Sequence, residues 1–186
     1  MNKDRKGRSG LIEKEDSILV IIDMQERLFP AMAEKEKLLE NVMRLVRFSK
    51  IAGIPVVTTE QEKLGPMLAD LKEDLKAIPP VSKVDFNCFA CEAFVTRIKD
   101  LSKGTLVLCG IEAHICVAQT ALSAGSDFEV HVVADAVASR SPRNCVIALE
   151  RMSQRGTTIT STEMVIYELL KRAGTDMFKQ VLKLVK

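Results

Sequence analysis

The sequence predicts an α/β fold of three layers, in which helices cover both faces of a mostly parallel six-stranded sheet. Short apolar runs of branched residues alternate about six times with segments of helical periodicity, and strands that are joined through helices pair in parallel. The runs are continuous rather than alternating, which is typical of strands buried on both faces. The expected strands are residues 17–22, 54–59, 81–84, 105–110, 128–134 and 157–160.

Helices are expected between these strands, where apolar residues recur every three to four positions. Gly53 ends the first helix, as glycine commonly does. Pro55 then stands at the start of the second strand, where its missing N–H does least harm. Residues 64–78 form a charged segment that two prolines close. The expected helices are residues 33–52, 92–101, 115–124, 142–154 and 176–185, with another after residue 160.

Two of the helix starts carry capping signals. Ser141 followed by Pro142 is an N-cap with proline at the first helical position. Thr160 and Glu163 have the spacing of a capping box, in which each side chain accepts from the main-chain N–H of the other residue. We therefore expect helices to begin directly after Ser141 and Thr160.

The composition indicates one globular domain and excludes some partners. The 186 residues suit a single domain, residues 17–186, after a polar and flexible tail, residues 1–16. A net charge of +2 with mixed signs and only 4% aromatic residues argue against nucleic acid. No apolar leader or membrane span is visible, so we expect a cytoplasmic protein. Five cysteines, an odd number, argue against a disulfide framework.

Three reactive side chains follow three of the expected strands. Asp23 ends the first strand, Lys83 ends the third, and Cys116 follows the fourth at the start of a helix. Because the carboxyl ends of parallel strands share one edge of the sheet, these side chains should converge. A helix N-terminus and a nearby ammonium group favour the thiolate of a cysteine, and a carboxylate can carry protons to and from it. The pattern therefore predicts a cysteine nucleophile that attacks a carbonyl with loss of ammonia or an amine.

At these residues the sequence closely resembles the isochorismatase-like cysteine hydrolases, a family that includes nicotinamidases and N-carbamoylsarcosine amidohydrolase. The resemblance covers about residues 16–172 and implies the family's Rossmann-like hydrolase fold. The motifs that carry it are Leu19-Val-Ile-Ile-Asp-Met-Gln25, Ser82-Lys-Val-Asp-Phe86 and Gly110-Ile-Glu-Ala-His-Ile-Cys-Val117, in family order and at family-like spacing.

The resemblance also implies the roles of individual residues. It places the catalytic triad at Asp23, Lys83 and Cys116, a cis peptide bond at Ile111–Glu112, and an oxyanion hole at the backbone N–H groups of Ile115 and Cys116. It further implies a homo-oligomer that acts on a small-molecule substrate. We expect iodoacetamide to alkylate Cys116 fastest near neutral pH. No organic cofactor is expected, because the sequence has no Gly-rich phosphate loop.

The segment Thr58-Thr-Glu-Gln61 resembles the isochorismatase domain-containing branch of the family. Nicotinamidases bind a metal through an aspartate and histidines after the second strand, where this chain has Glu60 and Gln61. We therefore expect no metal and no nicotinamidase activity. True isochorismatases lack the cysteine, so Cys116 favours hydrolysis of a small amide or carbamoyl compound.

The substrate pocket is expected around the loops that follow these strands. Glu112 could instead cap the following helix, and the imidazole of His114 could bond to the local backbone. The candidate pocket residues are Phe29, Glu60, Gln61, Phe86, Phe89, Glu112 and His114.

Two alternatives remain open from the sequence. Cys88 and Cys91 form a CxxC pair that lacks partners for zinc but would suit a thiol redox protein. A non-catalytic interaction or assembly protein could use the same fold. The intact set of Asp23, Lys83 and Cys116 favours the enzyme.

Overall fold

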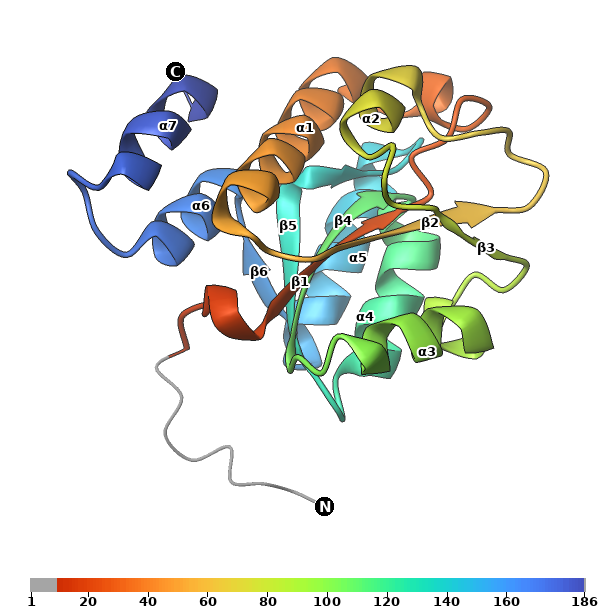
Figure 1. Ribbon diagram of the computed structural model, residues 1–186. Helices are drawn as coiled ribbons and strands as arrows, with labels where there is room; N and C mark the ends of the chain where they lie inside the picture. The colour runs from red at the N-terminus through yellow and green to blue at the C-terminus, as the bar shows by residue number, and fades with distance from the viewer. Residues whose placement is uncertain (1–9, 186) are drawn as a thin grey trace.

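The computed structural model describes residues 10–185 and has the three layers that the sequence predicts (Figure 1). The six strands are all parallel and lie in the order β3-β2-β1-β4-β5-β6. The predicted fold class is therefore confirmed. The strands are β1 (Ser17–Ile22), β2 (Val56–Gln61), β3 (Val81–Lys83), β4 (Thr105–Ile111), β5 (Glu129–Ala138) and β6 (Thr158–Thr160).

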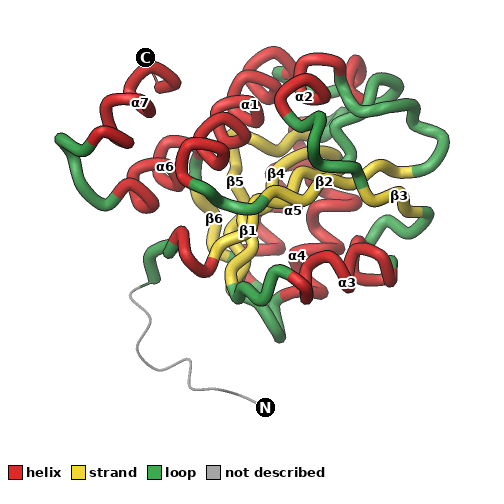
Figure 2. Tube along the Cα trace, viewed as in Figure 1, coloured by secondary structure: helices red, strands yellow, loops and turns green. Residues whose placement is uncertain are grey.

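Seven α-helices of the described chain cover the two faces of this sheet (Figure 2). The first, second and sixth lie on one face, with the seventh packed against the first and sixth, and the third to fifth lie on the other face (Figure 1). Between residues 10 and 185, no helix combines the length and apolar character that a membrane span needs. The helices are α1 (Lys35–Ala52), α2 (Ala69–Asp74), α3 (Glu92–Asp100), α4 (Ala118–Ala124), α5 (Pro142–Gln154), α6 (Thr162–Leu170) and α7 (Asp176–Val185).

The core has two parts, one on each side of the sheet. In β1, Leu19 and Ile21 belong to the part under α1, whereas Ile18, Val20 and Ile22 belong to the part under α3 and α4. Alternate residues of a strand point to opposite faces. The continuous apolar run of β1 thus reflects a strand that is buried on both sides.

The last part of the predicted flexible tail, residues 1–16, packs against the domain. Residues 1–9 of that tail lie outside the described part of the chain. Ile12, however, is only 1% exposed, and its N–H donates to the carboxylate of Glu168 in α6 at 3.1 Å. A short 3-10 helix, Lys14–Asp16, then leads into β1.

The start of α6 differs from the prediction by one residue. Its N-cap is Ser161, whose hydroxyl accepts from the Met164 N–H at 3.3 Å, so the expected Thr160–Glu163 capping box is wrong. Thr160 still pairs with Val133 of β5 as the last residue of β6, and this pairing keeps it in the strand. Ser141 does precede α5, but its side chain makes no capping hydrogen bond.

We expect Gly110→Ala to unfold the sheet at its centre. Gly110 of β4 pairs with Ile22 of β1 and has φ +113. A Cβ added at Gly110 would lie 2.1 Å from the Ile22 carbonyl oxygen. The expected loss in free energy of unfolding is about 4 kcal/mol or more, because backbone strain and overlap act together. Urea unfolding measures it. Gly125→Ala is the matched control, because Gly125 has φ −61 and an added Cβ would lie no nearer than 3.7 Å to any other group. Equal losses in both variants would contradict the prediction.

Candidate active site

The side chains of Asp23, Lys83 and Cys116 meet at the carboxyl edge of the sheet, where the order of the strands predicts them. Lys83 Nζ lies 2.7 Å from Asp23 Oδ2 and 3.8 Å from Cys116 Sγ. The side chains of Lys83 and Asp23 are 0% and 1% exposed. The three groups therefore form one buried contact network from separate parts of the chain.

Asp23 is held by its backbone and by both of its carboxylate oxygens. It follows β1 with φ +51, a left-handed conformation that aspartate tolerates better than most residues. Oδ1 accepts from the Thr59 hydroxyl at 2.7 Å, and Oδ2 accepts from Lys83. Thr59 belongs to the neighbouring strand β2, so the sheet itself sets the position of the carboxylate.

Lys83 places a buried ammonium group at the site. Burial by itself lowers the pKa of Lys83, but the charge and hydrogen bond of Asp23 outweigh it. The net effect raises the pKa of Lys83 above its usual range. A third partner is Gln61, whose Oε1 accepts from Lys83 Nζ at 2.7 Å. Gln61 was expected to line the substrate pocket, and its side chain contacts the lysine of the triad.

Cys116 lies in a π-helical turn, Ala113–Val117, that precedes α4. Its side chain is buried, with 6% of the residue exposed. Burial raises the pKa of the Cys116 thiol, Asp23 raises it further, and Lys83 lowers it only in part. These shifts favour a neutral thiol at rest, whereas the helix N-terminus and Lys83 led us to expect a thiolate. Burial and the neighbouring carboxylate together outweigh the lysine.

One of the two expected oxyanion donors is already used. The Ile115 N–H donates to the Glu112 carbonyl at 3.1 Å, inside the turn. Within residues 10–185, the Cys116 N–H has no main-chain acceptor outside its own helical turn. The peptide bond between Ile111 and Glu112, just before this turn, is cis.

Glu112 and His114 connect the Cys116 turn to the loop after β5. The buried carboxylate of Glu112 accepts from the backbone N–H and the Nε of Arg140 at 3.0 and 3.1 Å. His114 Nδ1 lies 2.9 Å from Ser139 Oγ. Glu112 makes no capping hydrogen bond to the following helix. Glu112 and His114 join two loops at the sheet edge, and their place in the substrate pocket stays a prediction.

Glu60 and Gln25 hold the loop that follows β2. Glu60, one of the pocket candidates, accepts from the Met67 N–H through Oε1 at 2.8 Å. The Gln25 side chain accepts from the Gln61 N–H at 2.8 Å and donates to the carbonyls of Gln61 and Gly65. Sequence reasoning missed Gln25. The available signal was an amide residue two positions after Asp23, at the end of a strand.

The three aromatic candidates differ in position. Phe89 packs edge-on against Phe94, with ring centroids 5.3 Å apart, and lies beside Phe128. Phe29 is half-buried against the core under α1. Phe86 is 54% exposed and lies just beyond Lys83. Of the three, only Phe86 presents its ring mainly to solvent.

The CxxC cysteines are unpaired. Cys88 is fully buried and Cys91 half-buried. Burial raises the pKa of the Cys88 thiol to about 11. Cys88 follows β3 and lies close enough to Lys83 for the lysine charge to offset part of this rise in pKa. Cys88 is thus a second protonated thiol near the triad rather than a reactive one.

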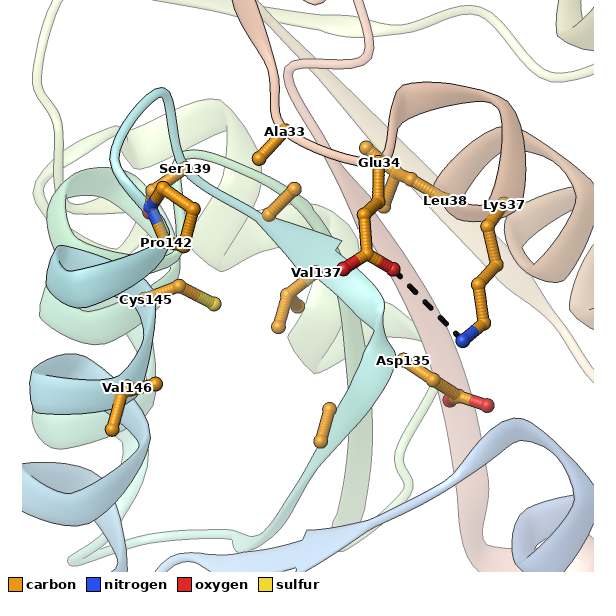
Figure 3. A pocket seen from close by; sticks show the side chains of 12 residues that line it. Ala33, Glu34, Lys37, Leu38, Asp135, Val137, Ser139, Pro142, Cys145 and Val146 are labelled. Atoms are coloured by element: carbon orange, nitrogen blue, oxygen red, sulfur yellow. Dashed lines mark ion pairs between the residues drawn. The ribbon is translucent and has the colours of Figure 1, made fainter.

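A separate cavity of about 180 Å³ opens at the same edge of the sheet, between the start of α1, the end of β5 and the start of α5 (Figure 3). Glu34 and Lys37 form an ion pair at its rim, and the Cys145 thiol lies on its wall (Figure 3). Its lining includes none of the triad residues. In the described part of the chain, no three His, Cys, Asp or Glu side chains are grouped as metal ligands would be.

The buried, protonated thiol reverses the expected order of alkylation. We expect iodoacetamide to modify the half-buried Cys91 before Cys116 at neutral pH, because the thiolate is the nucleophile and burial raises the pKa of Cys116. Labelling of Cys116 should increase steadily above pH 9. Peptide mass spectrometry of samples quenched over time measures both rates. Faster labelling of Cys116 than of Cys91 at pH 7 would contradict the assignment of a neutral thiol.

Comparisons with known proteins identify the family of this chain. Residues 17–164 match the isochorismatase domain. Isochorismatase domain-containing protein 2 of Danio rerio is 35% identical over 95% of this chain and 90% of its own length.

Two solved structures cover nearly the whole chain. A protein described as MAR1 ribonuclease of Caenorhabditis elegans is 32% identical, with a TM-score of 0.88, over 95% of this chain and 92% of its own. The YcaC gene product of Escherichia coli, described as an octameric hydrolase of unknown specificity, is 26% identical, with a TM-score of 0.90, over 96% of this chain and 92% of its own. The chain therefore belongs to the isochorismatase family.

Proposed function

We propose that this protein hydrolyses the C–N bond of a small amide or carbamoyl compound through a covalent intermediate on Cys116. The observation that carries the proposal is the position of the Lys83 ammonium group, in contact with both the Asp23 carboxylate and the Cys116 sulfur. A nucleophile, a proton carrier and a fixed positive charge are the groups that such a reaction needs. Membership of a family with hydrolase-like function adds support.

The first half of the reaction transfers one proton and exchanges one bond. The Cys116 thiol gives its proton to Asp23 as Sγ attacks the carbonyl carbon, and a C–S bond forms. The negative charge that develops on the carbonyl oxygen is stabilised by the Cys116 N–H and the Lys83 ammonium group. Asp23 then protonates the nitrogen, the C–N bond breaks, and ammonia or an amine leaves. Because the resting thiol is neutral, proton transfer accompanies attack.

The second half releases the product. Water attacks the thioester carbon and gives a proton to Asp23, and the C–S bond then breaks. The proton returns to Sγ, so the resting thiol is restored. These steps use no metal ion. Glu60 is hydrogen-bonded to Met67, and Gln61 is hydrogen-bonded to Lys83. Those are the side chains at the position where nicotinamidases carry metal ligands.

We further propose that the protein acts as a homo-oligomer, on the basis of the octameric Escherichia coli relative. The physiological substrate is to be sought among small amides and carbamoyl compounds. A library of these compounds, scored for release of ammonia or amine and for a mass increase on the intact protein, tests the proposal. RNA belongs in the same screen, because one relative is described as a ribonuclease. The absence of both turnover and adduct across the library would favour the assembly protein.

A further inference from the structure

Gln61, the last residue of β2, contacts the lysine of the triad with a fixed orientation. Its Oε1 accepts from Lys83 Nζ at 2.7 Å, and its Nε2 donates to the Val84 carbonyl at 2.6 Å. An ammonium group can only donate and a carbonyl can only accept. The amide oxygen must therefore face Lys83, and a flipped amide would lose both bonds.

The backbone of Gln61 is held as firmly as its side chain. The Gln25 amide accepts from the Gln61 N–H at 2.8 Å and donates to the Gln61 carbonyl at 3.0 Å. Both groups are thus bonded to one buried side chain that lies two residues after Asp23. The contact links the position of Gln61 to the loop that carries the proton carrier.

These bonds complete the set of acceptors around Lys83. An ammonium group has three N–H bonds, and Asp23 and Gln61 each accept at 2.7 Å. The third acceptor is Cys116 Sγ, at 3.8 Å. With two directions fixed at short range, the remaining N–H is directed at the sulfur.

Gln61 holds the ammonium group without adding a charge. The Asp23 carboxylate already balances Lys83, so a second carboxylate in place of the amide would leave a net negative charge beside Cys116. Such a charge disfavours a thiolate. A neutral acceptor at this position is therefore matched to a site in which the sulfur must become anionic.

We propose that Gln61 is a positioning residue that directs the Lys83 ammonium group toward Cys116 while leaving its positive charge available to the sulfur. The inference rests on the proposed cysteine chemistry and deepens it. It replaces the expected role of Gln61 as a residue that contacts the substrate.

The titration of Cys116 reports on this role, since few ionisable groups face the thiol. They are Asp23 after β1, Lys83 in β3 and Cys88 in the 3-10 turn after β3. The test compares Gln61→Glu and Gln61→Met with wild type in the full chain. Glu60→Gln is the matched control, because Glu60 neighbours Gln61 and contacts Met67 rather than Lys83.

Gln61→Glu is expected to slow alkylation of Cys116 by iodoacetamide about tenfold between pH 7.5 and 9.5, which corresponds to a rise of about one unit in the thiol pKa. Alkylation of Cys91 in the same sample is the internal reference. Glu60→Gln should match wild type. A Cys116 rate in Gln61→Glu equal to that in Glu60→Gln would overturn the proposal.

Gln61→Met keeps the size of the side chain and removes the acceptor. We expect kcat to fall about tenfold with KM nearly unchanged, because the lost contact is to Lys83 and not to the substrate. A raised KM at unchanged kcat would instead assign Gln61 to substrate binding. This variant decides the matter if Gln61→Glu does not fold. The alkylation readout needs no turnover, so it distinguishes failure of this role from failure of the proposed function.

Discussion

Cys116→Ala is expected to abolish hydrolysis of every amide or carbamoyl compound that the wild-type protein turns over. The loss should reach about a thousandfold or more, because removal of a nucleophile removes the covalent route as a whole. The buried site should tolerate the change, since alanine only shortens a side chain that packs among apolar neighbours. Steady-state kinetics and the melting temperature of the variant measure the two effects separately.

Two further variants sharpen this prediction. Cys116→Ser retains a hydroxyl near Lys83 and should also be inactive, because a serine hydroxyl holds its proton far more tightly than a thiol. Cys91→Ala is the matched control, since Cys91 is half-buried and its sulfur contacts the Ser82 carbonyl rather than Lys83. Intact-mass measurements should detect a substrate adduct on wild type and Cys91→Ala only. Normal turnover by Cys116→Ala would remove the nucleophile assignment.

The sequence was sufficient to place the three side chains but not to assign their states. Asp23, Lys83 and Cys116 each follow a recognisable strand, and parallel order alone brings strand ends together. The protonation state of Cys116 depends on how much of the thiol is buried and how near Asp23 lies. Neither quantity is local to the cysteine in sequence. The raised pKa of Cys116 therefore opposes the expected thiolate, although the three side chains do lie together.

The pocket candidates illustrate the same limit. Glu60, Gln61 and Glu112 are polar residues at the sheet edge, as expected, yet each is bonded to the protein itself. Their partners Met67, Lys83 and Arg140 lie 7, 22 and 28 residues away. A pattern within one segment cannot show that a distant segment supplies the hydrogen-bond partner. Local signals also misplaced the start of α6, because pairing of Thr160 with β5 outweighs its capping preference.

Asp23→Asn is expected to lower the free energy of unfolding by about 3–5 kcal/mol, because it leaves the buried Lys83 ammonium group without its opposite charge. Asparagine preserves the shape of the site: its Oδ1 can accept from Lys83 and its Nδ2 can donate to the Thr59 hydroxyl. The loss therefore measures charge rather than packing. Urea unfolding at pH 7 gives its magnitude.

Combining Lys83→Met with Asp23→Asn separates the effect of the unbalanced charge from other effects of the two substitutions. The double variant carries neither charge, so it should be less destabilised than the sum of the two single variants by about 1–3 kcal/mol. Additive losses would show that the ion pair is not the source of the effect.

Alkaline pH supplies an independent check, through the direction in which the free energy of unfolding changes with pH. In wild type the pKa of Lys83 is raised, so its stabilising contribution is complete at neutral pH and declines only as the pH rises through that raised value. In Asp23→Asn, burial acts without the carboxylate and lowers the pKa of Lys83. The folded state then releases its proton before the unfolded state does, and the variant should gain stability between about pH 8 and 10, where wild type does not.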